Sequence, residues 1–423
     1  MDHQPFSVVS LFSGAGGLDI GLEAAGFHTV SAVDTDADCL ASLCANQRSE
    51  IPTGTGRNHL QGTRLLRADI EDVSAEHLSP TGAGRKWPPD VMAGGPPCQP
   101  FSSSGKMLSV EDPRGKLFQH FVRLADALQP RLILFENVRG LVTARGTGGE
   151  PGEVLGMVKD AFEGIGYATT FALLNAADFG DAQRRVRCFM MATRATALPA
   201  FPDPTHAEKP SGGLFDSQLP WVTLRELLAT LPPPSPDEVV RPTPKLSAEF
   251  GRIPCGSGLK SAGARESTRP GGHWGYRQGT FIADPDQPAR TVTASASQDW
   301  IREPDGRLRR LTLRECAALQ GFPREWSFAG PVASRFRQVG NAVPVALGRI
   351  LGESMLTVLR QGEQRKPSSA TLPREFGSAI EYTRREHRRN GDSRKAARSK
   401  MQQGGIQVHE VKGLGSMDWS LEK

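Results

Sequence analysis

The stretch FSVVSLFSGAGGLDIGLEAAGFHTVSAVD, residues 6–34, decides the fold. Its apolar run at residues 6–12 predicts a buried strand, which is followed by a glycine turn and a helix that ends near Gly26. A second strand is predicted at residues 28–33, and Asp34 closes it. A glycine turn between a strand and a helix lets a ligand lie against bare backbone, at a helix N-terminus. An acid about 20 residues further on is the usual partner of ribose hydroxyls, so this stretch favours an adenosine-containing cofactor.

The alternation of strands and helices continues to about residue 193. Further strands are predicted at residues 64–68, 90–93, 131–135, 168–174 and 186–192, and helices at 36–46, 116–128 and 154–164. This order indicates an α/β fold with a doubly wound sheet.

The composition changes after residue 197, where Pro, Gly and Ser become frequent and the one predicted helix spans 223–231. Regular patterns return at 311–322 and 341–356. The chain beyond residue 360 is polar and carries the whole net charge of +5, and we expect it to be disordered or loosely docked. The predicted organisation is a catalytic and cofactor-binding domain at 1–197, a smaller domain at 198–330, a segment at 331–360 that returns to the first domain, and a basic tail at 361–423.

The composition excludes several classes of protein. The chain has 423 residues, 38% of them hydrophobic and 23% charged, as in a soluble enzyme. No run of 18 apolar residues predicts a membrane span, and the N-terminus lacks the features of a signal peptide. Six cysteines without a CxxC pair predict neither a disulfide framework nor a metal site. We therefore expect a cytoplasmic, nucleoid-associated protein that binds no metal and no membrane.

One cysteine lies where a reactive group is expected. GGPPCQPFS, residues 94–102, follows the predicted strand at 90–93 and forms a rigid loop of glycines and prolines. Doubly wound folds place their chemistry at this carboxyl end of the sheet, which makes Cys98 a candidate nucleophile. Cys188 lies in an apolar strand and Cys316 on a helix, so packing is the expected role of both.

Charged residues at other strand ends belong to the same edge. Glu136 closes the strand at 131–135, and a buried acid there must either pair or function. Arg185 and Arg187 stand at the start of the strand predicted at 186–192, and residues two positions apart lie on the same face of a strand. Asp69 ends the strand at 64–68. Taken singly, the arginines also suit a solvated strand edge, the glycines a plain tight turn, and Asp34 an exposed strand end.

Six motifs in order identify a family. FSGAGG, GGPPCQPFS, ENV, QRRVR, RRLTLRECAALQGFP and RQVGNAVP cover most of residues 6–358. In this order they resemble the DNA cytosine-5 methyltransferase family of bacterial restriction–modification systems. The resemblance implies a Rossmann-like S-adenosylmethionine-dependent methyltransferase domain with a smaller target-recognition domain. It also implies double-stranded DNA as substrate, S-adenosyl-L-methionine as cofactor, a monomer, and a cognate restriction endonuclease that acts separately.

The resemblance also implies roles for individual residues. Cys98 would be the nucleophile, Glu136 would contact the cytosine ring, and Arg185 and Arg187 would engage the base and the loop. DNA contacts are expected from Ser102, Ser104 and Lys106. Thr35 departs from the family, because many relatives carry a large hydrophobic residue there against the adenine, and this change is expected to weaken cofactor binding slightly. The expected cofactor-binding residues are Phe12, Gly14, Gly16, Gly17, Leu18, Asp34, Thr35, Asp69, Ile70, Pro97, Asn341 and Val343.

The chemistry of cytosine accounts for these residue types. Carbon 5 of the aromatic ring is a poor nucleophile until a thiolate adds to carbon 6, and an acid near ring nitrogen 3 eases that addition. Because the target atom lies inside the duplex, the base must be flipped out. The polar segment 102–117 is expected to close over it.

Two regions and three alternatives remain open. The variable segment 201–282 is expected to read the DNA sequence, and the basic tail either adds nonspecific affinity for DNA or has no function. A cytosine deaminase would need a PCxxC zinc signature, but Phe101 stands at its second cysteine. A silent DNA-binding relative is disfavoured by the intact catalytic set, and a tRNA methyltransferase by the long variable segment. Candidate DNA contacts in that segment are Arg241, Lys245, Arg252, Lys260, Arg265, His273, Trp274, Tyr276 and Arg277.

Overall fold

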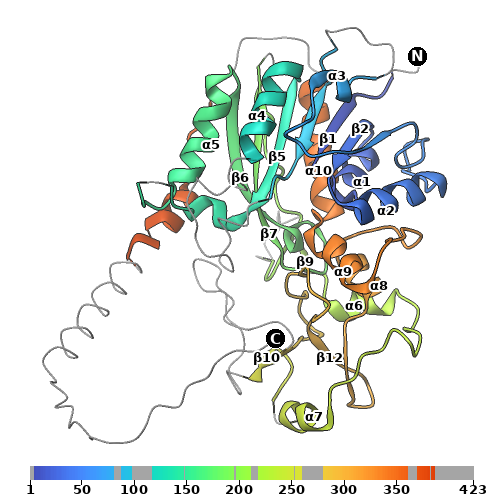
Figure 1. Cartoon of the computed structure of the whole chain (residues 1–423). Helices are drawn as coiled ribbons and strands as arrows, with labels where there is room; N and C mark the ends of the chain where they lie inside the picture. Colours follow the sequence, from blue (N-terminus) through green and yellow to red (C-terminus); the bar gives the residue numbers. More distant parts are fainter. Residues whose placement is uncertain are drawn as a thin grey trace, which may run out of the picture.

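The centre of the molecule is a seven-stranded sheet of order β3-β2-β1-β4-β5-β7-β6 (Figure 1). This computed structural model describes residues 4–80, 87–97, 117–146, 148–194, 197–210, 218–251, 253–259, 280–360, 369–381 and 383–385. Neighbouring strands from β3 to β5 are parallel, as the sequence predicts. The strands are β1 (Ser7–Leu11), β2 (His28–Asp34), β3 (Arg64–Arg67), β4 (Val91–Gly94), β5 (Leu132–Val138), β6 (Ala168–Asn175) and β7 (Val186–Thr193).

The last two strands depart from the parallel pattern, because β7 pairs antiparallel with both β5 and β6. The connection from β6 to β7 contains only the 3-10 turn η3 (Ala176–Phe179). A parallel pairing would need a crossover of a dozen or more residues, usually a helix, and this connection is too short for one.

Helices cover both faces of the sheet. Val8 and Leu132 pack on one face with the helices α1 (Gly17–Ala24) and α10 (Val345–Arg360). Val9 and Ile133, the next residues along the same strands, pack on the other face with α4 (Leu117–Leu128) and α5 (Glu153–Gly164). This double coverage explains why these strands are apolar at consecutive positions. The helices α2 (Ala37–Arg48) and α3 (Ala75–Leu78) flank the β2 and β3 end.

The C-terminal helix α10 packs directly on α1, as the returning segment 331–360 predicts. Gly21 permits the close approach, because a Cβ there would lie 2.7 Å from the backbone nitrogen of Arg349. The preceding helix, α9 (Val332–Asn341), and the turn after it therefore lie against the glycine turn between β1 and α1. Residues from both ends of the chain meet at this point.

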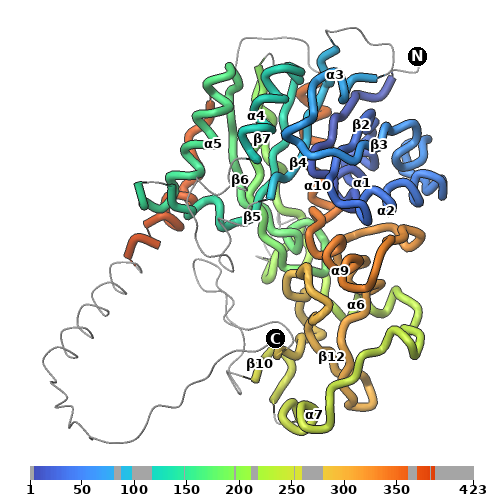
Figure 2. Tube along the Cα trace, viewed as in Figure 1, coloured from blue at the N-terminus to red at the C-terminus, as the bar shows by residue number. Residues whose placement is uncertain are grey.

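The smaller region lies below the sheet in Figure 2. Its own core is small and contains Phe250, Ile282, Trp300 and Leu308. A larger hydrophobic cluster joins the smaller region to the large domain, since Phe322 and Trp326 pack with Leu43 of α2. Packing therefore crosses the predicted boundary at residue 330. The elements of this region are β8 (His206–Ala207), β9 (Leu219–Pro220), α6 (Leu224–Ala229), α7 (Pro244–Phe250), β10 (Ser257–Gly258), β11 (Phe281–Ile282), β12 (Trp300–Arg302), β13 (Leu308–Arg310) and α8 (Leu313–Leu319).

Part of the basic tail is docked, which corrects the expectation of a loose tail from residue 361 onward. The backbone N–H of Ala370 donates to the carbonyl of Thr169 on the edge strand β6, at 2.9 Å. Phe376 is fully buried, with its ring 6.5 Å from that of Phe171. Burial of these apolar side chains outweighs the polar composition around them. The segment 369–385 therefore belongs to the large domain.

The helices α9 and α10 together, Val332–Arg360, are long and apolar enough to cross a membrane by composition alone. In this fold, 61% of their most apolar window is buried, and α10 forms one wall of the core. Their apolar character is accounted for by packing inside the protein.

Candidate active site and cofactor cavity

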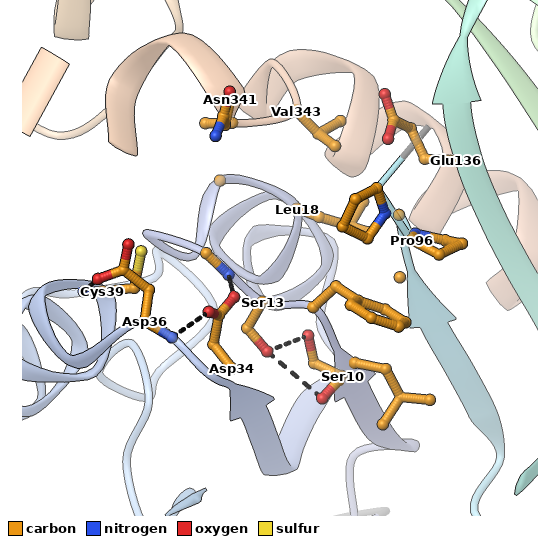
Figure 3. A pocket seen from close by; sticks show the side chains of 18 of the residues that line it. Ser10, Ser13, Leu18, Asp34, Asp36, Cys39, Pro96, Glu136, Asn341 and Val343 are labelled. Atoms are coloured by element: carbon orange, nitrogen blue, oxygen red, sulfur yellow. Dashed lines mark hydrogen bonds between the residues drawn. The ribbon is translucent and has the colours of Figure 1, made fainter. Parts of the chain in front are cut away.

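A cavity of about 430 Å³ opens at the carboxyl ends of β1, β2, β4 and β5. Its walls include the glycine turn after β1, the end of β2 and the turn after α9 (Figure 3). The carboxyl edge of a parallel sheet is where doubly wound folds bind their ligands.

The predicted cofactor residues gather in this cavity, with one exception. Gly16 does not line it. Gly16 instead begins α1 with a φ of 86°, and a Cβ there would lie 2.9 Å from Leu43. Its role is to shape the turn and admit the packing of α2. The cavity is lined by Phe12, Gly14, Gly17, Leu18, Asp34, Thr35, Asp69, Ile70, Pro97, Asn341 and Val343.

Asp34 connects the glycine turn to the end of β2. Its two carboxylate oxygens accept hydrogen bonds from the backbone N–H groups of Gly14 and Asp36, both at 2.8 Å. Burial raises the pKa of Asp34, while these two hydrogen bonds lower it. Each oxygen keeps a further lone pair, so Asp34 can hold the turn and still accept a ligand hydroxyl.

The turn itself is conformationally unusual. Phe12 has a φ of 55°, a left-handed conformation that few residues other than glycine adopt. Such strain is concentrated at functional sites, where the surrounding structure maintains it. Here the N–H of Ser13 donates to the carbonyl of Val33 at 3.0 Å, which fixes the turn against β2.

Asp36 and Arg337 form a pair at the cavity that sequence reasoning missed. Both line it, and Arg337 Nη2 lies 2.7 Å from Asp36 Oδ2. The other oxygen of Asp36 accepts from the N–H groups of Asp38 and Cys39 at the start of α2. Arg337 stands in the RQVGNAVP motif, so the motif could have pointed to it. Nothing in the sequence indicated its partner.

Glu136 and Arg187 form an ion pair at the other end of the cavity, with 3.1 Å between Oε1 and Nε. The antiparallel pairing of β5 with β7 places them there, because Val138 lies opposite Arg187. Their side chains are 13% and 14% exposed. Burial raises the pKa of Glu136, and Arg187 and Arg185 oppose that rise. The net result is a pKa above the ordinary value of a glutamate, so this carboxyl group takes up a proton more readily than an exposed glutamate.

Arg185 lines the cavity, and backbone carbonyls hold its guanidinium group in place. Its guanidinium donates to the backbone carbonyls of Val292, Gly340 and Ala342, each at 2.8 Å. Its side chain is buried, and both terminal nitrogens are used in these bonds. Arg185 therefore joins the start of β7 to the smaller region and to the end of α9, while its Nε has no hydrogen-bond partner among the described residues. Its contact with the base stays a prediction.

The loop after β4 reaches the cavity at Pro97. Asn137, next to Glu136, donates from Nδ2 to the carbonyl of Pro96 at 3.3 Å, which ties this loop to the end of β5. Cys98 follows directly, but it lies outside the described residues, as do Ser102, Ser104 and Lys106. The described wall thus ends one residue before the predicted nucleophile.

A strained glycine turn, acids at two strand ends and a buried Glu–Arg pair now lie around one cavity. Residues 6–357 match the family model described as C-5 cytosine-specific DNA methylase. The chain belongs to this family. The match includes every residue that lines the cavity.

Named relatives agree with this membership of the methylase family. The chain is 32% identical to the Type II methyltransferase M.SacI of Streptomyces achromogenes, over 89% of this chain and 98% of that protein. It is also 32% identical to the Type II methyltransferase M1.HphI of Haemophilus parahaemolyticus, over 82% and 86% of the two chains. A putative DNA modification methyltransferase encoded within an E. coli prophage has the same fold, with a TM-score of 0.55, 22% identity and coverage of 84% and 100%.

The two cysteines for which packing is the expected role lie in the core. Cys188 and Cys316 are buried, and burial raises the pKa of both thiols. In the described part of the chain, no group of His, Cys, Asp and Glu side chains could hold a metal ion.

Two of the candidate DNA contacts in the variable segment can be described. Arg241 pairs with Glu303, which also pairs with the buried Arg309, so Arg241 belongs to a packing network. Lys245 is exposed near the start of α7 and is available to DNA. Arg252, Lys260, Arg265, His273, Trp274, Tyr276 and Arg277 lie outside the described residues.

Proposed function

We propose that this DNA cytosine-5 methyltransferase methylates a flipped-out cytosine in a specific double-stranded sequence through a covalent adduct with Cys98. The observation that carries the proposal is the buried Glu136–Arg187 pair, which shares one cavity with the glycine turn and with Pro97, the residue before Cys98.

The residues of the cavity fit S-adenosylmethionine, which supplies an electrophilic methyl group. Phe12 offers an aromatic surface for adenine. Asp34 and Asp69 offer carboxylates for ribose hydroxyls and the adenine amino group. Gly14 leaves room for the cofactor against the backbone, since nothing lies within 4 Å of where its Cβ would stand, and the volume of about 430 Å³ suits a ligand of this size.

The protein groups have distinct proposed roles. The Cys98 thiolate adds to carbon 6 of cytosine, and the electron pair of the 5,6 double bond becomes available at carbon 5. Glu136, whose pKa burial raises, donates a hydrogen bond or proton to ring nitrogen 3 and eases that addition. Arg187 fixes the carboxyl group and faces the developing charge. After methylation at carbon 5, loss of the carbon 5 proton expels the thiolate and restores the ring.

The biological role follows from the relatives, which are named Type II methyltransferases. We propose that the enzyme protects DNA in the cytoplasm from a cognate restriction endonuclease that acts separately, and that it works as a monomer. The smaller region would select the sequence, since it lies beside the cavity and is joined to it by Arg185.

The test compares parent and Cys98→Ser with labelled cofactor on duplex DNA and on tRNA. A serine hydroxyl is far less ionised than a thiol, so methylation should be abolished while cofactor binding persists. DNA carrying 5-fluorocytosine should trap the parent covalently and leave Cys98→Ser free. Cys44→Ser, which changes a half-buried cysteine of α2, is the matched control and should behave like the parent. Normal turnover by Cys98→Ser would refute the covalent route, and methylation of tRNA alone would refute the DNA substrate.

A further inference from the structure

Arg139 is a half-buried arginine to which the described part of the chain offers no partner. It is the first residue of the 3-10 turn η2 (Arg139–Thr143), three positions after Glu136 on the strand that carries the proposed acid. Within the described ranges it makes no hydrogen bond, ion pair or ring contact. Burial lowers the pKa of Arg139.

This state is unusual within the part of the chain that the structure describes. The other lysines and arginines without a recorded contact, such as Arg48, Arg64 and Arg324, are all exposed. Buried or half-buried arginines such as Arg131 and Arg187 are instead matched by a carbonyl, a carboxylate or an aromatic ring. Removing a guanidinium from water without a partner is unfavourable, so Arg139 is held ready for an anion that the described residues do not supply.

Nearby acids of the chain are already engaged. Glu153 accepts hydrogen bonds from the N–H groups of Gly146, Gly148 and Glu150. The side chain of Glu150 pairs with Arg384 of the docked tail segment. The anion must therefore come from outside this part of the molecule.

The position of Arg139 separates it from the base and cofactor cavity. Glu136, Asn137 and Val138 line that cavity, whereas Arg139 does not. Because η2 follows β5 directly, a base that enters beside Glu136, as the proposed function requires, would bring its strand close to Arg139. The anions on that strand are phosphates, and guanidinium binds phosphate through two parallel hydrogen bonds.

We propose that Arg139 binds a backbone phosphate of the DNA strand that carries the target cytosine. The inference rests on the proposed function, because it requires the flipped base to reach Glu136. Its partial burial strengthens the contact relative to a fully exposed arginine, since the local dielectric constant is lower. Arg139 positions the strand and takes no part in the chemistry at the ring.

The first test measures DNA affinity of the full chain against salt concentration. Arg139→Gln should lower the slope of log affinity against log salt by about 0.9, the value for one lost phosphate contact. It should raise the KM for DNA by roughly tenfold, with kcat at saturating DNA nearly unchanged. Arg139→Lys should keep the salt slope, because the charge remains. Arg48→Gln removes an exposed arginine in the last turn of α2 and should match the parent.

The second test identifies the phosphate. In a duplex that contains the methylated sequence, single phosphates beside the target cytosine are replaced by neutral methylphosphonates. One replacement should weaken binding of the parent but not weaken Arg139→Gln further, as in a double-mutant cycle. An unchanged salt slope in Arg139→Gln, or equal losses in both proteins at every phosphate, would overturn the proposal. If the parent methylates no DNA at all, the proposed function fails instead, which is a separate result.

Discussion

Removing the docked tail segment should destabilise the large domain, although it contains none of the family motifs. The segment contributes Phe376, which is fully buried against Phe171, and Ile380, which packs against Gly152. Replacing a buried phenylalanine with alanine costs about 3–5 kcal/mol, through lost transfer energy and the cavity that remains. The net stability of a domain is about 5–15 kcal/mol, so Phe376→Ala removes a large share of it.

The assay is thermal unfolding of the parent and four variants, followed by circular dichroism. Phe376→Ala should lower the Tm by roughly 10 °C, and deletion after Arg360 should lower it by at least as much. Deletion after Arg385 keeps the docked contacts that the structure describes in the tail, and it should leave the Tm within about 1 °C of the parent. Arg384→Ala removes an exposed ion pair with Glu150, which is worth at most about 1 kcal/mol, and is the matched control.

The same deletions separate stability from DNA binding. Deletion after Arg385 removes the basic stretch that follows, so it should lower nonspecific affinity for DNA and flatten its salt dependence without changing the methylated sequence. Bisulfite sequencing of a plasmid methylated by each protein checks the sequence. Equal melting of Phe376→Ala and the parent would show that the segment does not contribute to the core and would refute the reasoning.

Two further predictions concern the carboxylates. Asp69→Ala should weaken S-adenosylmethionine binding by about ten- to a hundredfold, which is the effect of a lost hydrogen bond to a charged group, and it should leave DNA binding intact. An unchanged Kd for S-adenosylmethionine, measured by calorimetry, would remove Asp69 from the site. Burial, opposed by the Ser10 hydroxyl and reinforced by Glu23, raises the pKa of Asp19 to about 7. Because the folded state then favours the protonated form, the contribution of Asp19 to the free energy of unfolding is present below about pH 4. It is lost as the pH rises through 7. Urea unfolding from pH 5 to 8.5 should show the parent losing stability relative to Asp19→Asn, by up to about 3 kcal/mol, and parallel profiles would contradict this.

The sequence predicted the parts of the fold that depend on local pattern. Consecutive apolar residues such as Val8 and Val9 indicate a strand that is buried on both faces, and Asp34 ends such a strand. The short strands of the smaller region could not be predicted in this way, because a two-residue strand such as β10 is defined by its distant partner. The burial of Phe376 could not be predicted for a related reason, since only a few apolar residues stand among many charged ones in this segment.

The two arginines of the QRRVR motif show the same limit within the site. The two-residue repeat of a strand places Arg185 and Arg187 on one face, but this pattern cannot distinguish the roles of the two side chains. They differ because the carbonyls of Gly340 and Ala342, which lie 155 and 157 residues away in the chain, bond to Arg185. Arg187 instead forms an ion pair with Glu136. Roles that depend on such distant contacts need the structure.

The return of the C-terminal segment to the glycine turn determines when the cofactor cavity can form during synthesis. Asp36 and Arg337 are 301 residues apart, and both line the cavity. At about 5–20 residues per second, a ribosome takes on the order of 15–60 s to make the chain between them. Throughout that time α1 lacks α10, and its apolar face is exposed. A nascent chain therefore cannot bind its cofactor early, and its long-range contacts favour slow folding. Chaperones that shield this face are expected to raise the yield of active enzyme.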